Sequence, residues 1–304
     1  MKSEAHYDVA IVGAGPAGLS AALVLGRCRR RVVIVDHDRP RNFAARTVNG
    51  YLGVHHASPA EFRAAGHNQL AGLDVEFIGG EVTNVAKGDV FALTIDDHRL
   101  LTAKKLLLAT GVVDCLPAVE RIREFYGTSV HHCPYCDGLE HADEQLFALG
   151  DGDGVVGLAL TLRNWSERVT ACSNGTHLAN VQRRALERNG IDYRPERLVS
   201  LAGSEGRVSQ AIFESGPPLD CDALFFSGER RPGSNLAVRL GCEPAASGTV
   251  QTGRKERTCV PGVFVAGDAS GDVQFAIVAA AEGAIAATAI NRELQDEAFG
   301  PEPQ

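Results

Sequence analysis

The sequence predicts an α/β protein built from two Rossmann-like three-layer domains, the second inserted into the first. Three features indicate this arrangement. Residues 7–36 read as strand, glycine turn, helix and strand; a second copy of that order starts at Gln145; and a buried strand, turn and long helix follow Pro261. We expect the discontinuous first domain to comprise residues 1–112 and 241–304, and the second to comprise residues 113–240.

Composition and charge limit the classes of function. The 304 residues provide room for about two domains, each with an apolar core. A content of 44% hydrophobic and 22% charged residues with 33 glycines is typical of a soluble globular protein. The net charge of −8 argues against a nucleic-acid partner.

The chain also lacks the patterns of export and membrane insertion. Its N-terminal residues run directly into a strand pattern, with no secretory signal, so we expect a cytoplasmic protein. No window reaches the roughly 18 consecutive apolar residues that a spanning helix needs. We therefore expect no membrane role.

The first copy carries a dinucleotide fingerprint in its full context. Gly13 permits a tight turn, Gly15 lets the backbone approach a pyrophosphate, and Gly18 lets helix and strand pack closely. The N-terminus of the helix, which runs to about Arg27, then faces the phosphates. Asp36, at the end of the following strand, is placed to accept ribose hydroxyl protons. The alternative is a glycine turn without a ligand. The predicted binding residues of this turn are Gly13, Gly15, Pro16, Ala17, Gly18 and Asp36.

The second copy lacks parts of this fingerprint. Its turn, Gly150-Asp-Gly152-Asp-Gly154-Val155, leads into a helix predicted to run through Trp165. Val155 replaces the third glycine, so the helix cannot pack as tightly there, and Ser173 stands at the position equivalent to Asp36. Asn174, Gly175 and Thr176 follow instead of the arginines that hold a 2′-phosphate. A shifted register, Gly152-x-Gly154-x-x-Gly157, restores the glycines but not the ribose partner. We interpret this site as degenerate for nicotinamide nucleotides.

Two further turns complete the predicted cofactor site of the first domain. An apolar strand ends in Ala109-Thr110-Gly111, and another closes on Gly267-Asp268 before a helix from about Gln274. An aspartate at a strand end beside a helix N-terminus suits a ribityl or pyrophosphate contact, and the helix dipole can stabilise charge on a reduced flavin. The alternative interpretation is an ordinary strand-turn-helix joint.

The segment from His131 to Gly138 predicts redox chemistry. Cys133 and Cys136 lie three residues apart at the start of a helix, with Pro134 in its first turn, so they share one face and can close a small reducible disulfide ring. A helix N-terminus lowers a thiol's pKa, and the thiolate is the form that attacks a disulfide. Asp137 is placed to give or take the proton of each exchange step.

Other interpretations of this segment remain open. Cys133 and Cys136 with His131 and His132 could bind zinc, although structural zinc usually takes two separated ligand pairs, or the cysteines could be purely structural; we expect no metal. His132 fits either a general base or a residue that orients the backbone or is merely solvated, and His131 has no assigned role. The six remaining cysteines stand alone and are expected to be inert thiols: Cys28, Cys115, Cys172, Cys221, Cys242 and Cys259.

The order of these motifs resembles the low-molecular-weight thioredoxin reductases over essentially the whole chain. The resemblance implies FAD on the first domain, Cys136 facing the flavin, Cys133 attacking or releasing the partner's sulfur, and Asp137 as the acid. It also implies a homodimer in which rotation of the small domain carries the CxxC between flavin and partner. The further FAD contacts predicted from it are Arg41, Asn42, Val82, Thr110, Gly111, Gly267, Asp268, Gln274, Phe275 and Ala276.

Two departures from that family bear on the nucleotide. Members that use nicotinamide carry HRR where this chain has Ser173-Asn174-Gly175, and Arg-Gln-Ala where it has Gln274-Phe275-Ala276, which puts NADPH in doubt. The sequence motif His132-Cys133-Pro134-Tyr135-Cys136, together with Arg41-Asn42, resembles that of one branch of the family. This branch contains dithiol oxidases and reductases that take electrons from ferredoxin or another flavin. In that branch the second domain is often a remnant, which leaves open a second nucleotide or flavin there.

We therefore predict an FAD-dependent disulfide oxidoreductase that does not use NADPH. Its partner is a thioredoxin-like protein or a small-molecule dithiol, and its electron donor or acceptor is ferredoxin, a flavin or oxygen. One alternative is an NADPH-dependent thioredoxin reductase with an atypical nucleotide site that binds phosphate through Arg183 or Arg184. The other is a flavin-binding redox sensor without turnover.

Overall fold

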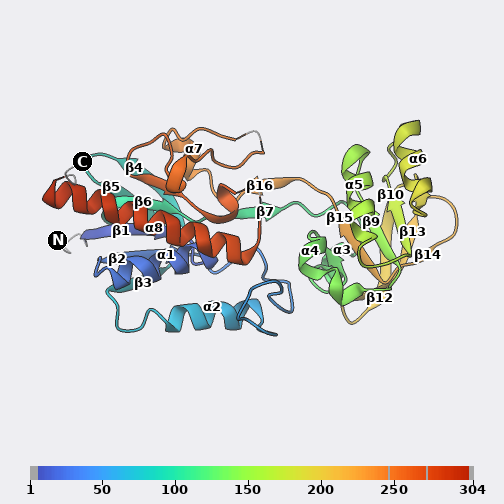
Figure 1. Cartoon of the computed structure of the whole chain (residues 1–304), viewed down its shortest axis with the longest axis horizontal. Helices are drawn as coiled ribbons and strands as arrows, with labels where there is room; N and C mark the ends of the chain where they lie inside the picture. The colour runs from blue at the N-terminus through green and yellow to red at the C-terminus, as the bar shows by residue number, and fades with distance from the viewer. Residues whose placement is uncertain (1–5, 246, 272, 301–304) are drawn as a thin grey trace. The chain divides into compact units, whose positions relative to one another are not determined.

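The computed structural model describes residues 6–245, 247–271 and 273–300, and the chain falls into two compact units (Figure 1). The first, here called the N-terminal unit, comprises residues 1–41, 50–113 and 230–304; the second, here called the CxxC unit, comprises residues 42–49 and 114–229. The predicted fold class, two Rossmann-like sheets with one unit inserted into the other, is confirmed. The chain returns to the N-terminal unit at Arg230, earlier than the expected residue 241, because β16 (Arg230–Pro232) pairs with β7 (Val112–Asp114).

The N-terminal unit is organised around one mixed sheet. Its parallel part follows the order β3-β2-β1-β6, and β6 is long enough to pair β17 along its second half and antiparallel β5 along its first half. Strand β4 then pairs antiparallel with β5. The strands are β1 (His6–Val12), β2 (Val32–Asp36), β3 (Val75–Gly79), β4 (Val82–Lys87), β5 (Phe91–Ile95), β6 (Arg99–Leu108) and β17 (Val263–Val265).

Alternation along the buried strands divides the core of this unit into two layers. In β1, Val9 and Ile11 pack toward the helices on one face, whereas Ala10 and Val12 pack into the second cluster on the other. Helices α1 and α8 run side by side in the first layer (Figure 1). The helical segments are α1 (Pro16–Arg27), α2 (Pro59–Asn68), α7 (Leu236–Arg239), α8 (Ala276–Phe299), and the 3-10 turns η2 (Arg254–Glu256) and η3 (Gly267–Ala269).

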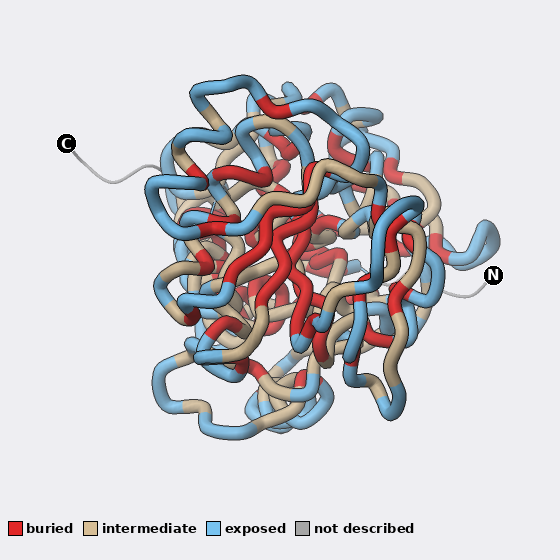
Figure 2. Tube along the Cα trace, turned by 90° about the vertical axis from the view of Figure 1, so that its right-hand side faces the viewer, coloured by how far each residue is buried: buried red, intermediate tan, exposed pale blue. Residues whose placement is uncertain are grey.

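The CxxC unit repeats the parallel arrangement with shorter strands. Its five-stranded parallel sheet has the order β11-β10-β9-β15-β8, and a separate antiparallel sheet has the order β12-β13-β14. Leu146 and Ala148 of β9 pack on the helical side, and Phe147 and Leu149 pack on the side of the antiparallel sheet. In Figure 2 the buried residues gather on the central strands and the exposed ones on the surrounding loops.

The elements of the CxxC unit have these bounds. The strands are β8 (Val130–His131), β9 (Leu146–Leu149), β10 (Val169–Cys172), β11 (Asp192–Arg194), β12 (Leu198–Ser204), β13 (Arg207–Phe213), β14 (Leu219–Asp220) and β15 (Ala223–Phe226). The helices are α3 (Ile122–Phe125), α4 (Pro134–Asp137), α5 (Gly152–Leu162), α6 (Asn180–Arg188) and the 3-10 turn η1 (Leu139–His141). Helix α5 ends at Leu162, short of the expected Trp165. Within the described ranges, no helix combines the length and the apolar character needed to cross a bilayer.

Glycines set how closely the helices approach each other in the N-terminal unit. A Cβ built on Gly283 of α8 would lie 2.0 Å from the carbonyl oxygen of Ala17 in α1, and one on Gly18 would lie 1.9 Å from the carbonyl oxygen of Gly13. Both obstacles are backbone atoms, so neither can rotate out of the way. The start of α1, and hence the glycine turn before it, is thereby fixed against α8.

We predict that Gly283→Ala lowers the free energy of unfolding by at least about 2 kcal/mol, because α8 must move away from α1 to admit the methyl group. Gly157→Ala is the matched control. A Cβ at that position of α5 meets nothing within 4 Å, so the change should be neutral or stabilise by up to about 1 kcal/mol. Chemical denaturation monitored by circular dichroism measures both; equal stability of the two variants would contradict the packing argument.

Candidate redox site

The redox pair lies at the tip of a one-turn helix. Cys133 is the N-cap residue of α4 in an extended conformation, Pro134 opens the turn, and Cys136 joins Cys133 in a disulfide with their Cα atoms 5.3 Å apart. The predicted pairing is therefore present, although the helix is a single turn continued by η1.

Packing holds this turn in place. The Cys136 N–H donates to the Cys133 carbonyl (3.2 Å), and the Asn49 side-chain amide donates to the Cys136 carbonyl (3.0 Å). A Cβ on Gly138 would lie 2.7 Å from the Trp165 indole ring, so the turn sits directly against that ring. Tyr135 meets the same indole edge-on at 5.8 Å between ring centroids.

Asp137 begins a chain of polar side chains that runs into the CxxC unit. Its Oδ2 lies 3.4 Å from Nδ1 of His131, and the Nε2 atoms of His131 and His141 lie 3.0 Å apart. Nδ1 of His141 in turn lies 2.6 Å from Oε2 of Glu144. Both imidazole rings are buried, whereas the Asp137 and Glu144 side chains are 20% and 33% exposed.

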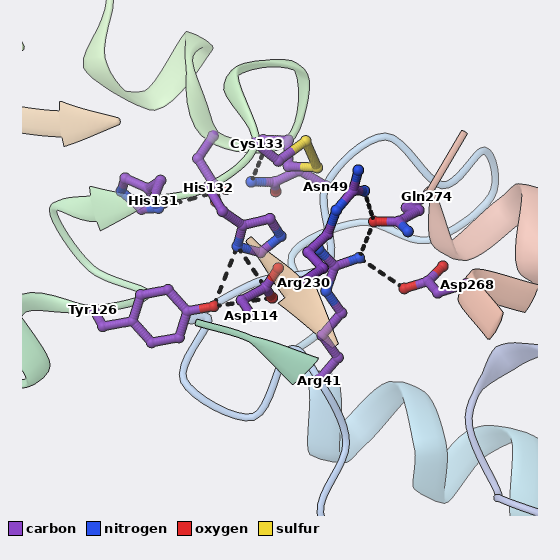
Figure 3. Close-up of a disulfide and its surroundings, with 12 residues drawn as sticks. Arg41, Asn49, Asp114, Tyr126, His131, His132, Cys133, Arg230, Asp268 and Gln274 are labelled. Carbon is purple, nitrogen blue, oxygen red and sulfur yellow. Dashed lines mark hydrogen bonds and ion pairs between the residues drawn. A yellow bond between two sulfur atoms is a disulfide. The ribbon is translucent and has the colours of Figure 1, made fainter. Parts of the chain in front are cut away.

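His132 belongs to a separate group of polar side chains (Figure 3). Its Nδ1 lies 3.2 Å from the Tyr126 hydroxyl and 3.8 Å from Oδ2 of Asp114, to which the Tyr126 hydroxyl also donates (3.4 Å). The Asp114 side chain is 5% exposed and that of His132 is 28% exposed. A buried carboxylate thus orients a partly exposed imidazole, which is the arrangement of a positioned base.

The other six cysteines are unpaired thiols, and three of them are buried. Burial raises the pKa of the Cys172 thiol to about 12 and that of Cys221 well above its usual range. Burial also raises the pKa of Cys242. These thiols stay protonated at neutral pH and are poor nucleophiles, so disulfide exchange is confined to other positions. Within the described ranges no cluster of three or more His, Cys, Asp or Glu side chains is placed to hold a metal.

The N-terminal unit forms a glycine-lined turn before α1. Gly13 has φ +106° and passes the Ala109 backbone so closely that a Cβ would lie 2.3 Å from its carbonyl oxygen, whereas a Cβ on Gly15 would point into open space. The N–H groups of the first α1 turn, including those of Ala17 and Gly18, have no partners within the helix. This is the geometry that a pyrophosphate requires.

Asp36 closes the turn on its other side. Its Oδ1 accepts from the Ala14 N–H (2.9 Å), and its Oδ2 pairs with Arg63 of α2 (2.7 Å). Asp38 and Arg63 line a cavity of about 260 Å³ together with His67. Arg63 was not identified in the sequence, because only the packing of α2 brings it to Asp36.

Three of the residues expected to contact the cofactor are hydrogen-bonded to one another. Nη1 of Arg41 donates to Oδ2 of Asp268 (2.8 Å) and to Oε1 of Gln274 (2.7 Å), as Figure 3 shows. Gly267, at φ +79°, donates its N–H to Oε2 of Glu282 (2.7 Å).

The remaining predicted contacts lie at element ends. Phe275 and Ala276 are the N-cap and first residue of α8, Val82 begins β4, and Thr110 and Gly111 follow β6. Asn42, also an expected FAD contact, belongs to the CxxC unit.

The second glycine turn, before α5, differs from the first. Asp151 caps α5, Asp153 lies in its first turn, and both are exposed. Ser173 is fully buried, and its Oγ donates to the Thr176 carbonyl (2.6 Å) and lies 2.9 Å from the Tyr193 hydroxyl. Val155 is also fully buried, so α5 sits far enough from the turn to admit an isopropyl group. In the shifted glycine register, all three glycines, Gly152, Gly154 and Gly157, lie within α5.

Two dinucleotide-type folds and a CxxC disulfide define a flavin-type disulfide oxidoreductase. Residues 7–283 match the pyridine nucleotide-disulphide oxidoreductase family, and the chain belongs to it. It is a thioredoxin reductase-like FAD-dependent oxidoreductase, and FAD is the cofactor typical of the family.

Relatives resemble the chain over most of its length. It is 32% identical over 282 residues, 88% of each chain, to the thioredoxin reductase tcpT of Claviceps purpurea. A crystal structure of a putative thioredoxin reductase TrxB from Bacillus anthracis is 31% identical and superimposes with a TM-score of 0.92 over 96% of this chain and 100% of that one. The crystal structure of HlmI is 33% identical, with a TM-score of 0.93 over 98% of this chain and 95% of that one.

Proposed function

We propose that the protein holds FAD on its N-terminal unit and exchanges two electrons between that flavin and a partner dithiol or disulfide through Cys133 and Cys136, without NADPH. The difference between the two glycine turns carries the proposal: the first has no carboxylate in its first helical turn and an acid, Asp36, at the ribose position, whereas the second has the exposed carboxylates Asp151 and Asp153 at its helix start and Ser173 at the ribose position.

The first turn supports the assignment of FAD. Open space over Gly15 and the N–H groups at the start of α1 fit a pyrophosphate, and Asp36 beside them fits a ribose. Arg41, Asp268 and Gln274, which are expected to be further FAD contacts, form one hydrogen-bonded group. When bound, the flavin would supply an acceptor and donor for electron pairs.

The second turn supports independence from NADPH. Asp151 and Asp153 place two negative charges at the α5 N-terminus, where a nucleotide would place its phosphates. Ser173, at the position of the ribose-binding acid, already bonds Thr176 and Tyr193 inside the core. A nicotinamide nucleotide would therefore meet repulsion at its phosphates and no partner at its ribose.

The proposed exchange conserves atoms and electrons. A partner thiolate attacks Sγ of Cys133, the Cys133–Cys136 bond breaks, and Cys136 leaves as a thiolate. The partner's second thiolate then attacks the mixed disulfide, which releases Cys133 and an oxidised partner. Two electrons now reside on the cysteine pair, two protons have left the partner, and Asp137 is the nearest carboxylate in sequence to take one. The reverse sequence reduces a disulfide.

The relatives support the proposed partner and assembly. The relatives' names include thioredoxin reductase, so a thioredoxin-like protein is one candidate partner and a small-molecule dithiol is the other. Ferredoxin, a free flavin or oxygen would complete the electron balance in place of NADPH. We also propose a homodimer, and that the degenerate second site leaves room for another nucleotide or flavin.

We predict that NADPH does not reduce the flavin. In anaerobic stopped-flow mixing, NADPH at about 1 mM, the top of the usual KM range, should leave the flavin absorbance unchanged, while a dithiol bleaches it. Rapid bleaching at micromolar NADPH would contradict the proposal. If Arg183→Ala then weakened that bleaching, the enzyme would be the NADPH-dependent alternative.

We also predict that Gly15→Ala removes the flavin without unfolding the protein. Gly15 has φ −74°, which alanine adopts freely, and its Cβ would occupy only the space assigned to the pyrophosphate. The flavin-to-protein absorbance ratio after purification should fall at least about tenfold, which is a loss of about 1.4 kcal/mol or more in affinity. Gly157→Ala is the control and should keep its flavin; full occupancy in Gly15→Ala would refute the placement.

A further inference from the structure

Two buried histidines connect the residue next to the redox pair with the surface of the CxxC unit. His131 ends β8 and His141 ends η1, and their side chains are 5% and 9% exposed. The three contacts Asp137–His131, His131–His141 and His141–Glu144 measure 3.4, 3.0 and 2.6 Å. Neither the disulfide nor the glycine turns require this chain of residues for their geometry.

The contact between two Nε2 atoms limits how many protons the row of four side chains, Asp137, His131, His141 and Glu144, can hold. An Nε2–Nε2 contact is a hydrogen bond only if one ring donates and the other accepts, so one proton lies between the histidines. The His141–Glu144 contact is a hydrogen bond and also needs one proton, and the 3.4 Å ion-pair contact between His131 and Asp137 needs one for a proton to pass across it. Three protons therefore serve three contacts, and buried polar groups left without them would carry a large desolvation cost.

Shifting these protons moves one proton from end to end. If Asp137 accepts a proton from a thiol, its shared proton moves to Nδ1 of His131, the proton on Nε2 of His131 moves to Nε2 of His141, and the proton on Nδ1 of His141 moves to Glu144. Glu144 then releases a proton to water. The S–H bond has been broken and no electron has moved. Two protons now lie between Asp137 and His131 and none between His141 and Glu144, so the imidazole rings must turn over and redistribute their protons before the next one passes.

The surroundings favour this route. Phe225 of β15 packs on both rings, at 5.3 Å from His131 and 6.2 Å from His141 between ring centroids, and it shields them from water. The arginines near the outer end, Arg163 and Arg168, donate to the backbone carbonyls of Ser166 and Asp143. Among the described residues, the carboxylates that pair with the two rings are Asp137 and Glu144.

We propose that Asp137, His131, His141 and Glu144 form a proton relay that carries the protons of dithiol oxidation from the Cys133–Cys136 pair to solvent, and returns them during disulfide reduction. The relay deepens the proposed function and rests on it for its physiological direction. His131 and His141 act through Asp137 and do not touch the sulfur atoms, so they are positioning and relay residues.

Glu144→Gln tests the relay with little structural change, because the amide keeps the hydrogen bond to His141 but cannot release a proton. Oxidised protein is mixed anaerobically with dithiothreitol and quenched in acid, and the free thiols of Cys133 and Cys136 are alkylated in denaturant and counted by mass spectrometry. This readout follows the disulfide alone, while absorbance follows the flavin in the same samples.

We expect disulfide reduction at pH 7 to slow at least about tenfold in Glu144→Gln and in His141→Gln, which is less than the roughly 100-fold minimum typical of a direct general acid or base, because these residues act through Asp137. Added imidazole buffer should restore much of the rate in Glu144→Gln and leave the wild-type rate unchanged. The exposed residue His177, outside the relay, supplies the control His177→Gln, which should react like wild type.

Wild-type rates in Glu144→Gln and His141→Gln, or slow rates that imidazole does not raise, would overturn the relay. The second result would mean that the variants act through structure. Failure of the proposed function has a different signature: the disulfide of the wild-type protein would be reduced while its flavin absorbance stayed unchanged.

Discussion

The site depends on holding two sulfur atoms where a bond between them can form and break repeatedly. Cys133 and Cys136 achieve this within one helical turn, with their Cα atoms 5.3 Å apart. The turn is held by Asn49 at its carbonyl and by Trp165 at Gly138. Because neither support is covalent or involves the sulfurs, the disulfide can open without loss of the local backbone. In the proposed exchange, Asp137, which follows the pair directly in sequence, accepts the proton.

The two copies of one fold differ in their glycine turns, and the proposed function gives them different purposes. In the N-terminal unit, close backbone contacts at Gly13 and Gly18 fix a turn that leaves Gly15 open. In the CxxC unit, the corresponding helix is capped by Asp151, and its interior is filled by Val155. The second fold keeps its parallel sheet, so its structural role is to present α4, η1 and the two histidines. Nucleotide binding is not needed for that role.

Much of the fold could be predicted because local sequence determines it. Alternating apolar residues and the glycine turns gave the start of β1, the end of α1, the end of β2 and the start of β9 to within about two residues, the usual uncertainty of such boundaries. The Cys133–Cys136 pairing was also local. Helix α5 ended three residues early, and the return at Arg230 was missed because it depends on pairing with β7, far away in the sequence.

The rest of the site could not be predicted for a related reason. Arg63 reaches Asp36 only after α2 packs, and Arg41 meets Asp268 across 227 residues of sequence. His131 received no role because its partner, His141, carries no motif of its own; its position follows from the turn after α4. Such contacts are set by tertiary packing, which leaves no periodic signal in the chain.

The central proposal is that electrons pass between a dithiol and the flavin through the Cys133–Cys136 pair. Anaerobic titration with a dithiol, followed by flavin absorbance, tests it in the wild-type protein, in Cys136→Ser and in the control Cys28→Ser, which changes an exposed thiol outside the pair. The account predicts bleaching in the wild type and in Cys28→Ser, and an oxidised flavin in Cys136→Ser. Equal bleaching in Cys136→Ser would contradict it.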